Sequence, residues 1–340
     1  MALISKKKII YPISDGLRIF LQKYGREVDF PIYYSDLRRY TGSIPLYDSK
    51  GNDTLWETVF YAESDRDEIH FNVKKIYSQL KAEGDMSVMK HLYVDRIDLC
   101  VYGNTQPFRV RIVNKINDNF DYFYVKIADA SRVYGLELEH LLSPNRISYL
   151  VKDNTLIEEH IAGIPGEQFM RQHINDPLLN PIRLAKEFVK FNERCFVRLL
   201  GDMHSSNFVV VVTPDFEETH YRIRAIDFDQ QSYEGKKSIY LPQYFKQNNA
   251  LIKMGIKYIT SESMAQYQKE ERALIATRLK TSTIEIEDLL TCMENDKIST
   301  QENIDSLKRD LAKHYKNEKF LNCTNMGQIL RQSLEQVLKK

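Results

Sequence analysis

Residues 200–229 constrain the fold of this chain most, because polar loops there enclose two strand-forming runs. The first loop reads Leu-Gly-Asp-Met-His-Ser-Ser-Asn and ends at Asn207. The apolar run 208–212 follows it, and after a polar break the alternating run 221–226 leads to Asp227. Two such runs separated by a turn predict a β-hairpin. Because a hairpin folds back on itself, we expect Asn207 and Asp227 to lie at the same end of it.

The polar side chains around this predicted hairpin suit the transfer of a phosphoryl group. Such a transfer needs a carboxylate that orients the attacking hydroxyl and takes its proton, and Asp202 is the residue we expect there. It also needs Mg²⁺, a hard cation that prefers oxygen ligands and often takes few of them from protein. Asn207 and Asp227 would supply them. Asp229 is either a second metal contact or a hydrogen-bonded structural aspartate.

Each of these residues also has a purely structural interpretation. Asp202 could cap a turn, and Asp227 could be a surface carboxylate. The apolar pair Ala225-Ile226 before Asp227 argues for a buried strand end, where an unpaired carboxylate is costly without a cation. His204 we interpret as a structural histidine bonded to the loop backbone.

Length and composition exclude several classes of protein. The chain has 340 residues and a formal net charge of +1, which gives no whole-molecule reason to expect binding to nucleic acid. No apolar run reaches the roughly 18 residues that a membrane-spanning helix needs. The run after Lys6-Lys7-Lys8 stops at Tyr11-Pro12, so we expect no export signal and no membrane partner. The four cysteines make no CxxC or zinc-finger pattern, which favours a cytoplasmic protein.

Apolar periodicity predicts strands and helices up to about residue 226 and only helices from about residue 251 onward. The expected strands are 46–47, 55–61, 96–102, 108–113, 122–127, 147–151, 155–161, 208–212 and 221–226. The expected helices are 14–24, 65–84, 131–142, 181–195 and several between 251 and 340. Capping-box patterns of Asp65 with Glu68 and of Ser299 with Glu302 indicate two helix starts.

Two motifs carry a resemblance to a known family. The segments Gly201-Asp202-Met203-His204-Ser205-Ser206-Asn207 and Ile226-Asp227-Phe228-Asp229 resemble the catalytic and metal-binding motifs of the aminoglycoside-phosphotransferase and choline-kinase-like branch of the protein-kinase fold. The resemblance covers roughly residues 93–250. It implies ATP and Mg²⁺ as cofactors, Asp202 as catalytic base, Asn207 as a catalytic and metal-binding residue, and Asp227 as a metal ligand.

The resemblance continues upstream with a weaker pattern. Lys126, in Val125-Lys126-Ile127, is similar to the strand lysine that binds the ATP phosphates, and Glu137 is similar to its ion-pair partner. Glu139 is the competing choice for that partner. The segment from Leu156 to Gly166 resembles the hinge that binds adenine through backbone groups, for which we assign Glu159 and Ile161.

The sequence also departs from the family pattern. Leu200 replaces the histidine that often begins the catalytic loop. The loop between the first two strands of the resembling region has only Gly103, followed by Asn104, where a glycine-rich phosphate clamp is common. The usual small-molecule-kinase sequences after Asp229 and the Ala-Pro-Glu motif of eukaryotic protein kinases are both absent.

These observations predict an α+β, two-lobed protein-kinase-like fold with an extra N-terminal α/β region. Residues 1–91 would form the extension, 92–161 the antiparallel-sheet N-lobe and hinge, and 162–340 the mostly helical C-lobe with the catalytic loop. The extension carries no motif that indicates a role.

The predicted activity is transfer of the γ-phosphate of ATP to a hydroxyl acceptor, a small molecule in the first hypothesis. The second hypothesis is an atypical bacterial protein kinase similar to the HipA-like toxin kinases. Their motif, Asp-x-His-x-x-Asn-Phe, also matches this chain through Asn207-Phe208. The third is a pseudokinase scaffold that binds nucleotide or nothing, against which the joint presence of Lys126, Asp202, Asn207 and Asp227 argues. The sequence predicts neither the acceptor's identity nor the oligomeric state.

Overall fold

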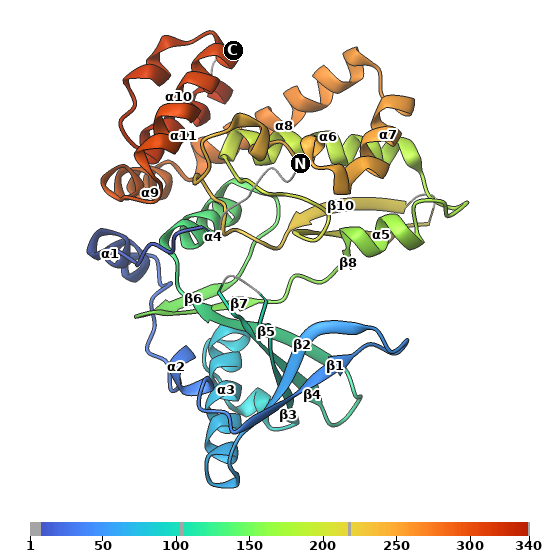
Figure 1. Cartoon of the computed structure of the whole chain (residues 1–340), viewed down its shortest axis with the longest axis vertical. Helices are drawn as coiled ribbons and strands as arrows, with labels where there is room; N and C mark the ends of the chain where they lie inside the picture. Colours follow the sequence, from blue (N-terminus) through green and yellow to red (C-terminus); the bar gives the residue numbers. More distant parts are fainter. Residues whose placement is uncertain (1–7, 103–104, 217–218, 339–340) are drawn as a thin grey trace. The chain divides into compact units, whose positions relative to one another are not determined.

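The computed structural model describes residues 8–102, 105–216 and 219–338. Its contacts divide the chain into two compact units, whose elements are labelled in Figure 1. The sheet unit comprises Arg18–Asp129 and Ile147–His160. The helical unit comprises the described residues up to Leu17, then Ala130–Arg146, and the chain from Ile161 onward.

The sheet unit is built on one seven-stranded antiparallel sheet in the order β1-β2-β3-β4-β5-β7-β6. Its strands are β1 (Gly42–Tyr47), β2 (Asp53–Phe60), β3 (Leu92–Leu99), β4 (Phe108–Asn114), β5 (Phe120–Ile127), β6 (Tyr149–Lys152) and β7 (Thr155–Glu159). Helices α1 (Asp15–Lys23), α2 (Tyr34–Leu37) and α3 (Glu63–Ala82) accompany them. The connections β1–β2, β4–β5 and β6–β7 are short hairpins, so these pairs are neighbours both in sequence and in the sheet.

Helix α3 covers one face of this sheet because its apolar stripe recurs at helical spacing. Ile69, Val73 and Ile76 are buried in one core with alternate strand residues such as Val110 and Phe123. The predicted stripe is therefore confirmed. The predicted capping box is wrong, since the helix begins at Glu63 and its N-cap is Ala62, which has no side-chain oxygen to accept a hydrogen bond.

The helical unit contains a small sheet and most of the helices. The three strands pair in the order β10-β9-β8 and are β8 (Ile164–Pro165), β9 (Phe208–Pro214) and β10 (Thr219–Ala225). The helices are α4 (Ala130–Leu142), α5 (Gly166–Gln172), α6 (Pro181–Arg198), α7 (Asn249–Tyr258), α8 (Ser261–Thr281), α9 (Thr283–Asn295), α10 (Gln301–Tyr315) and α11 (Met326–Leu338). Asn180 caps α6 by accepting a hydrogen bond from the Arg183 amide, with Pro181 at the first helical position. Thr300, rather than the predicted Ser299, caps α10.

The expected α+β class is confirmed, with an antiparallel sheet region followed by a mostly helical one. The structure groups the chain differently from the predicted segments. Strands β1 and β2, from the predicted extension, continue the sheet through pairing of Thr58 with Asp98, and α4 belongs to the helical unit. The turn at Gly103-Asn104 lies outside the described residues. No helix in the described ranges is long and apolar enough to cross a membrane.

Candidate active site

The hairpin of β9 and β10 brings Asn207 and Asp227 to one end, as predicted. Phe208 pairs with Ala225 at the last position of the ladder, and the Ile226 amide donates to the Asn207 carbonyl at 3.0 Å. Gly166 permits this packing, because a Cβ there would lie 2.3 Å from the Phe208 ring and 2.7 Å from the Ser205 carbonyl. Asn207 and Asp227 therefore flank the end of the ladder at which Phe208 and Ala225 are buried.

The loop before β9 holds Asp202 in a left-handed backbone conformation, with φ 60°. Its amide donates to the Ile239 carbonyl at 3.0 Å, and the preceding Leu200 forms an isolated antiparallel bridge with Gln231. A non-glycine residue in the left-handed region of backbone conformations costs free energy, and the conformation persists only where surrounding contacts offset that cost. Backbone hydrogen bonds on both sides of the loop therefore hold Leu200 and Asp202 in place.

Asn207 and Asp227 are each anchored through one side-chain atom. The Asn207 Nδ2 donates to the Asp202 carbonyl at 2.8 Å, and Asp227 Oδ1 accepts from the Asp229 amide at 3.0 Å. Among the described residues, no hydrogen-bond donor is recorded for Asn207 Oδ1 or Asp227 Oδ2. Two fixed oxygen donors are a set that suits Mg²⁺ when phosphate and water supply its other ligands.

The described part of the chain contains no group of three or more His, Cys, Asp or Glu side chains arranged around a metal position. Asp227 and Asn207, one carboxylate and one amide, are the oxygen ligands that this hairpin end would offer a cation.

The carboxyl group of Asp202 has an unusual environment. Burial raises its pKa to about 7, with further contributions from the nearby carboxylates of Asp227, Glu234 and Asp229. Its nearest basic group is His204 Nε2, 3.9 Å from Asp202 Oδ1, and burial lowers the pKa of that histidine. Asp202 is therefore poised to exchange a proton near neutral pH.

His204 is bonded to the loop backbone, as predicted. Its Nδ1 accepts from the Ser206 amide at 3.3 Å, and its own amide donates to the Asp202 carbonyl at 2.9 Å. Because one ring nitrogen is engaged in this way, the side chain stabilises the loop.

Arg132 is a site residue that the sequence analysis missed. It lies in the first turn of α4, and its Nη1 is 2.7 Å from Asp227 Oδ1 and 2.7 Å from Asp229 Oδ1. Asp229 is therefore ion-paired. The sequence signal was the position of this charged residue at the start of the expected helix 131–142, whose other residues are mostly apolar.

Helix α4 also carries the two glutamates considered as partners of Lys126. Glu139 forms a buried ion pair with Arg198, whereas Glu137 is fully buried one helical face away. The Glu139 carboxylate is therefore engaged within the helical unit. Lys126 belongs to the sheet unit and Glu137 to the helical unit, so their ion pair stays a prediction.

Within the sheet unit, Lys126 on β5 has a partner that we had not predicted. Its Nζ lies 2.7 Å from Glu158 Oε2 on β7, and both side chains are buried. The strand register pairs Lys126 with Leu156, so Glu158 is the diagonal neighbour on the same face. Alternation along the predicted strand 155–161 puts Leu156 and Glu158 on one face, but the sequence does not give the register that sets Glu158 beside Lys126.

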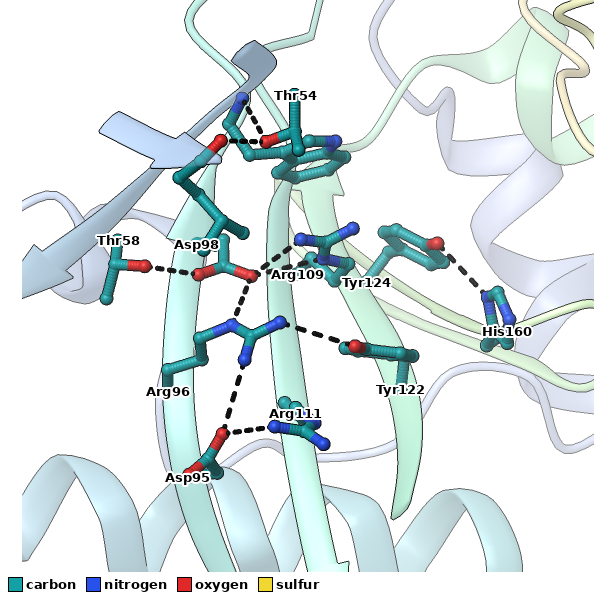
Figure 2. A network of polar contacts seen from close by, with 12 residues as sticks. Thr54, Thr58, Asp95, Arg96, Asp98, Arg109, Arg111, Tyr122, Tyr124 and His160 are labelled. Carbon is teal, nitrogen blue, oxygen red and sulfur yellow. Dashed lines mark hydrogen bonds and ion pairs between the residues drawn. The ribbon is translucent and has the colours of Figure 1, made fainter. Parts of the chain in front are cut away.

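The sheet face that carries Lys126 continues as a network of charges and aromatic rings (Figure 2). Asp98 at its centre is fully buried and accepts from Thr58 Oγ1 at 2.8 Å, Arg96 Nε at 3.1 Å and Arg109 Nη2 at 2.8 Å. The Arg109 guanidinium also lies 4.3 Å from the centre of the Trp56 ring. This face is therefore a cross-linked polar layer opposite the α3 core.

The two predicted hinge residues lie at the end of β7. The Glu159 amide donates to the Ser148 carbonyl at 3.1 Å, and its carboxylate pairs with Lys81 Nζ at 3.0 Å. Ile161, two residues on, is buried. Because the Glu159 amide is engaged, adenine contacts through these residues would use other backbone groups, and that role stays a prediction.

The chain matches no protein-family model, and no curated protein matches it in sequence. Among solved structures, one similar chain is the autoinhibited serine kinase domain of the giant muscle protein titin. The likeness has a TM-score of 0.30 and 12% sequence identity, and covers 72% of this chain and 93% of that one.

Proposed function

We propose that the chain is a phosphotransferase that uses ATP and Mg²⁺ and moves the γ-phosphate to a hydroxyl group of a small-molecule acceptor. The observation that carries the proposal is the convergence of Asp202, Asn207 and Asp227 around one hairpin end. Their order along the chain and their residue types also match the family motif described above.

Asp202 is assigned to the acceptor hydroxyl. A base works best when its pKa lies near the working pH, and the pKa of about 7 meets that condition. Its carboxylate accepts no recorded hydrogen bond from the described residues, so it is available to a substrate proton. The left-handed backbone at Asp202 sets the direction of this side chain.

Asn207 Oδ1 and Asp227 Oδ2 would hold the divalent cation. When bound, Mg²⁺ neutralises charge on the phosphates of the nucleotide. The anchoring of each side chain through its second polar atom means that neither has to reorient when the cation binds. Preorganisation of this kind lowers the cost of binding.

Lys126 is assigned to the nucleotide phosphates. Its ion pair with Glu158 fixes the ammonium group on the polar face of the sheet unit. The four cysteines of the chain are free thiols, which suits a cytoplasmic location.

The test combines binding with turnover. Mg²⁺ and ATP together should raise the melting temperature of the wild type, because a ligand of the folded state alone adds RT ln(1 + [L]/Kd) to its stability. Asp227→Ala should abolish the magnesium-dependent part of this shift, and equal shifts in both proteins would contradict the assignment.

A screen of acceptor classes with γ-labelled ATP then identifies the reaction. Label on a small hydroxyl compound supports the proposal, whereas label on the chain itself or on added polypeptide would favour a protein kinase. Nucleotide binding without transfer to any acceptor would favour a scaffold.

A further inference from the structure

The position of Arg132 between two carboxylates bears on how many cations the site can hold. Its side chain is only 2% exposed, and a single nitrogen, Nη1, contacts Asp227 and Asp229 at equal distances of 2.7 Å. A surface ion pair would leave the guanidinium mobile and hydrated, but this one is enclosed at the start of a helix. The positive charge is therefore a permanent part of the site.

The two carboxylate oxygens of Asp227 have different roles: Oδ1 accepts hydrogen bonds from protein, and Oδ2 is the oxygen assigned to the cation. Oδ1 accepts from both Arg132 and the Asp229 amide, whereas Oδ2 has no recorded protein donor in the described ranges. Because Nη1 already contacts both Asp227 Oδ1 and Asp229 Oδ1, a second cation that used these two oxygens would have to compete with the guanidinium for them.

We propose that Arg132 takes the place of a second divalent cation, so that the site binds one divalent ion per nucleotide through Asp227 Oδ2 and Asn207 Oδ1. Asp229 is then a partner of the guanidinium and holds no metal. This inference rests on the proposed function and adds to it a metal stoichiometry and a positioning residue, Arg132.

The physical reason for retaining the arginine is the local excess of negative charge. Asp227, Glu234 and Asp229 lie close enough to Asp202 to contribute to its raised pKa. One fixed guanidinium neutralises part of that charge before any ligand arrives. It also holds Asp227 in one orientation, which a freely exchanging second cation would not do.

The experiment counts Mn²⁺ bound to the full chain in the presence of a non-hydrolysable ATP analogue. Titration followed by electron paramagnetic resonance and by calorimetry should give one ion per wild-type chain. Arg132→Gln removes the charge and should bind a second, weaker Mn²⁺, whereas Arg132→Lys keeps the charge and should bind one. Arg272→Gln, which breaks the ion pair between Arg272 on α8 and Glu193 on α6, is the matched control and should also bind one.

Substitution of the two aspartates separates their roles. Asp227→Asn should lower Mn²⁺ affinity by about a hundredfold or more, while Asp229→Asn should cost about tenfold or less, as expected of a residue that contacts a ligand's partner. Circular dichroism and melting curves establish that each variant is folded.

Three results would overturn the inference. The first is two Mn²⁺ ions in the wild type, a result that needs no variant. The second is one ion in folded Arg132→Gln with unchanged affinity, and the third is an equal loss from both aspartate variants. If the wild type binds no Mn²⁺ with nucleotide and Asp227→Asn changes nothing, the proposed function fails along with the inference.

Discussion

Two aspartates, Asp98 in the sheet unit and Asp202 in the helical unit, show how differently the chain treats a carboxylate. Asp98 is fully buried and has a threonine hydroxyl and two guanidinium groups around it. Asp202 is 24% exposed, has no recorded cationic partner closer than His204 at 3.9 Å, and faces other carboxylates.

The difference separates a structural role from a chemical one. A carboxylate that serves only the fold is surrounded by enough donors to offset the loss of hydration. Asp202 lacks them, so its environment destabilises the charged form and leaves it reactive toward a proton. Perturbed groups of this kind cluster at functional sites.

The largest expected effect is on turnover. Asp202→Asn should reduce phosphoryl transfer by about a thousandfold, since the amide cannot accept the proton, while Mg²⁺-ATP binding stays near the wild-type level. Steady-state rates and melting shifts measure the two quantities. Asp95→Asn, on the polar face of the sheet, is the control and should leave the rate unchanged. A rate loss below tenfold in Asp202→Asn would contradict the assignment.

The second effect is on the stability of the sheet unit. Asp98→Ala should lower the free energy of unfolding by about 3 kcal/mol, because it leaves Arg96 and Arg109 without their shared buried partner. Denaturant unfolding measures this loss. Asp95→Ala removes a carboxylate that is 31% exposed and should cost less than about 1 kcal/mol. Equal losses would show that Asp98 is not the centre of the network.

The third effect concerns pH. Asp202 has a pKa of about 7 in the folded chain and an ordinary value of 3.8, so the folded state binds more protons between these values. Its contribution to stability is therefore lost as pH rises from about 4 to 7, and is constant above that. In metal-free buffer we expect the stability of Asp202→Asn relative to the wild type to rise by about 4 kcal/mol across this range, because each unit of pKa difference corresponds to about 1.4 kcal/mol. If the difference in stability between the wild type and Asp202→Asn is the same at every pH, the raised pKa of Asp202 is contradicted.

The smallest effect should come from a neutral hydrogen bond of the polar face. Tyr124 Oη and His160 Nδ1 are 3.1 Å apart, and a dashed line marks this hydrogen bond in Figure 2. Tyr124→Phe should cost about 1 kcal/mol or less, because water replaces much of that bond in the unfolded chain. A loss as large as that of Asp98→Ala would remove the distinction between charged and neutral partners on this face.

The sequence predicted the elements whose residues repeat with a clear period. The stripe of α3 and the hairpin of β9 and β10 are examples, and the convergence of Asn207 with Asp227 followed from the hairpin alone. Local patterns carry this information because each element buries one face.

Contacts between distant residues were beyond such reasoning. Arg132 meets Asp227 across 95 positions, and Lys126 meets Glu158 across 32. The apolar periodicity of one element does not determine which charged side chain of another element will pair with it. The helix starts failed for a related reason: several residues near each start could cap it, and tertiary packing decides between them.

Arg198 has a consequence for how the site can move. Its guanidinium donates to the Leu138 carbonyl and pairs with Glu139 on α4, while the Gln231 side chain donates to its carbonyl. Arg198 thereby links three segments: helix α4, which carries Arg132, the start of the Asp202 loop, and the segment after Asp229. Opening any one of them alone would break bonds to the others, so we expect their amide protons to exchange with solvent as a single slow group.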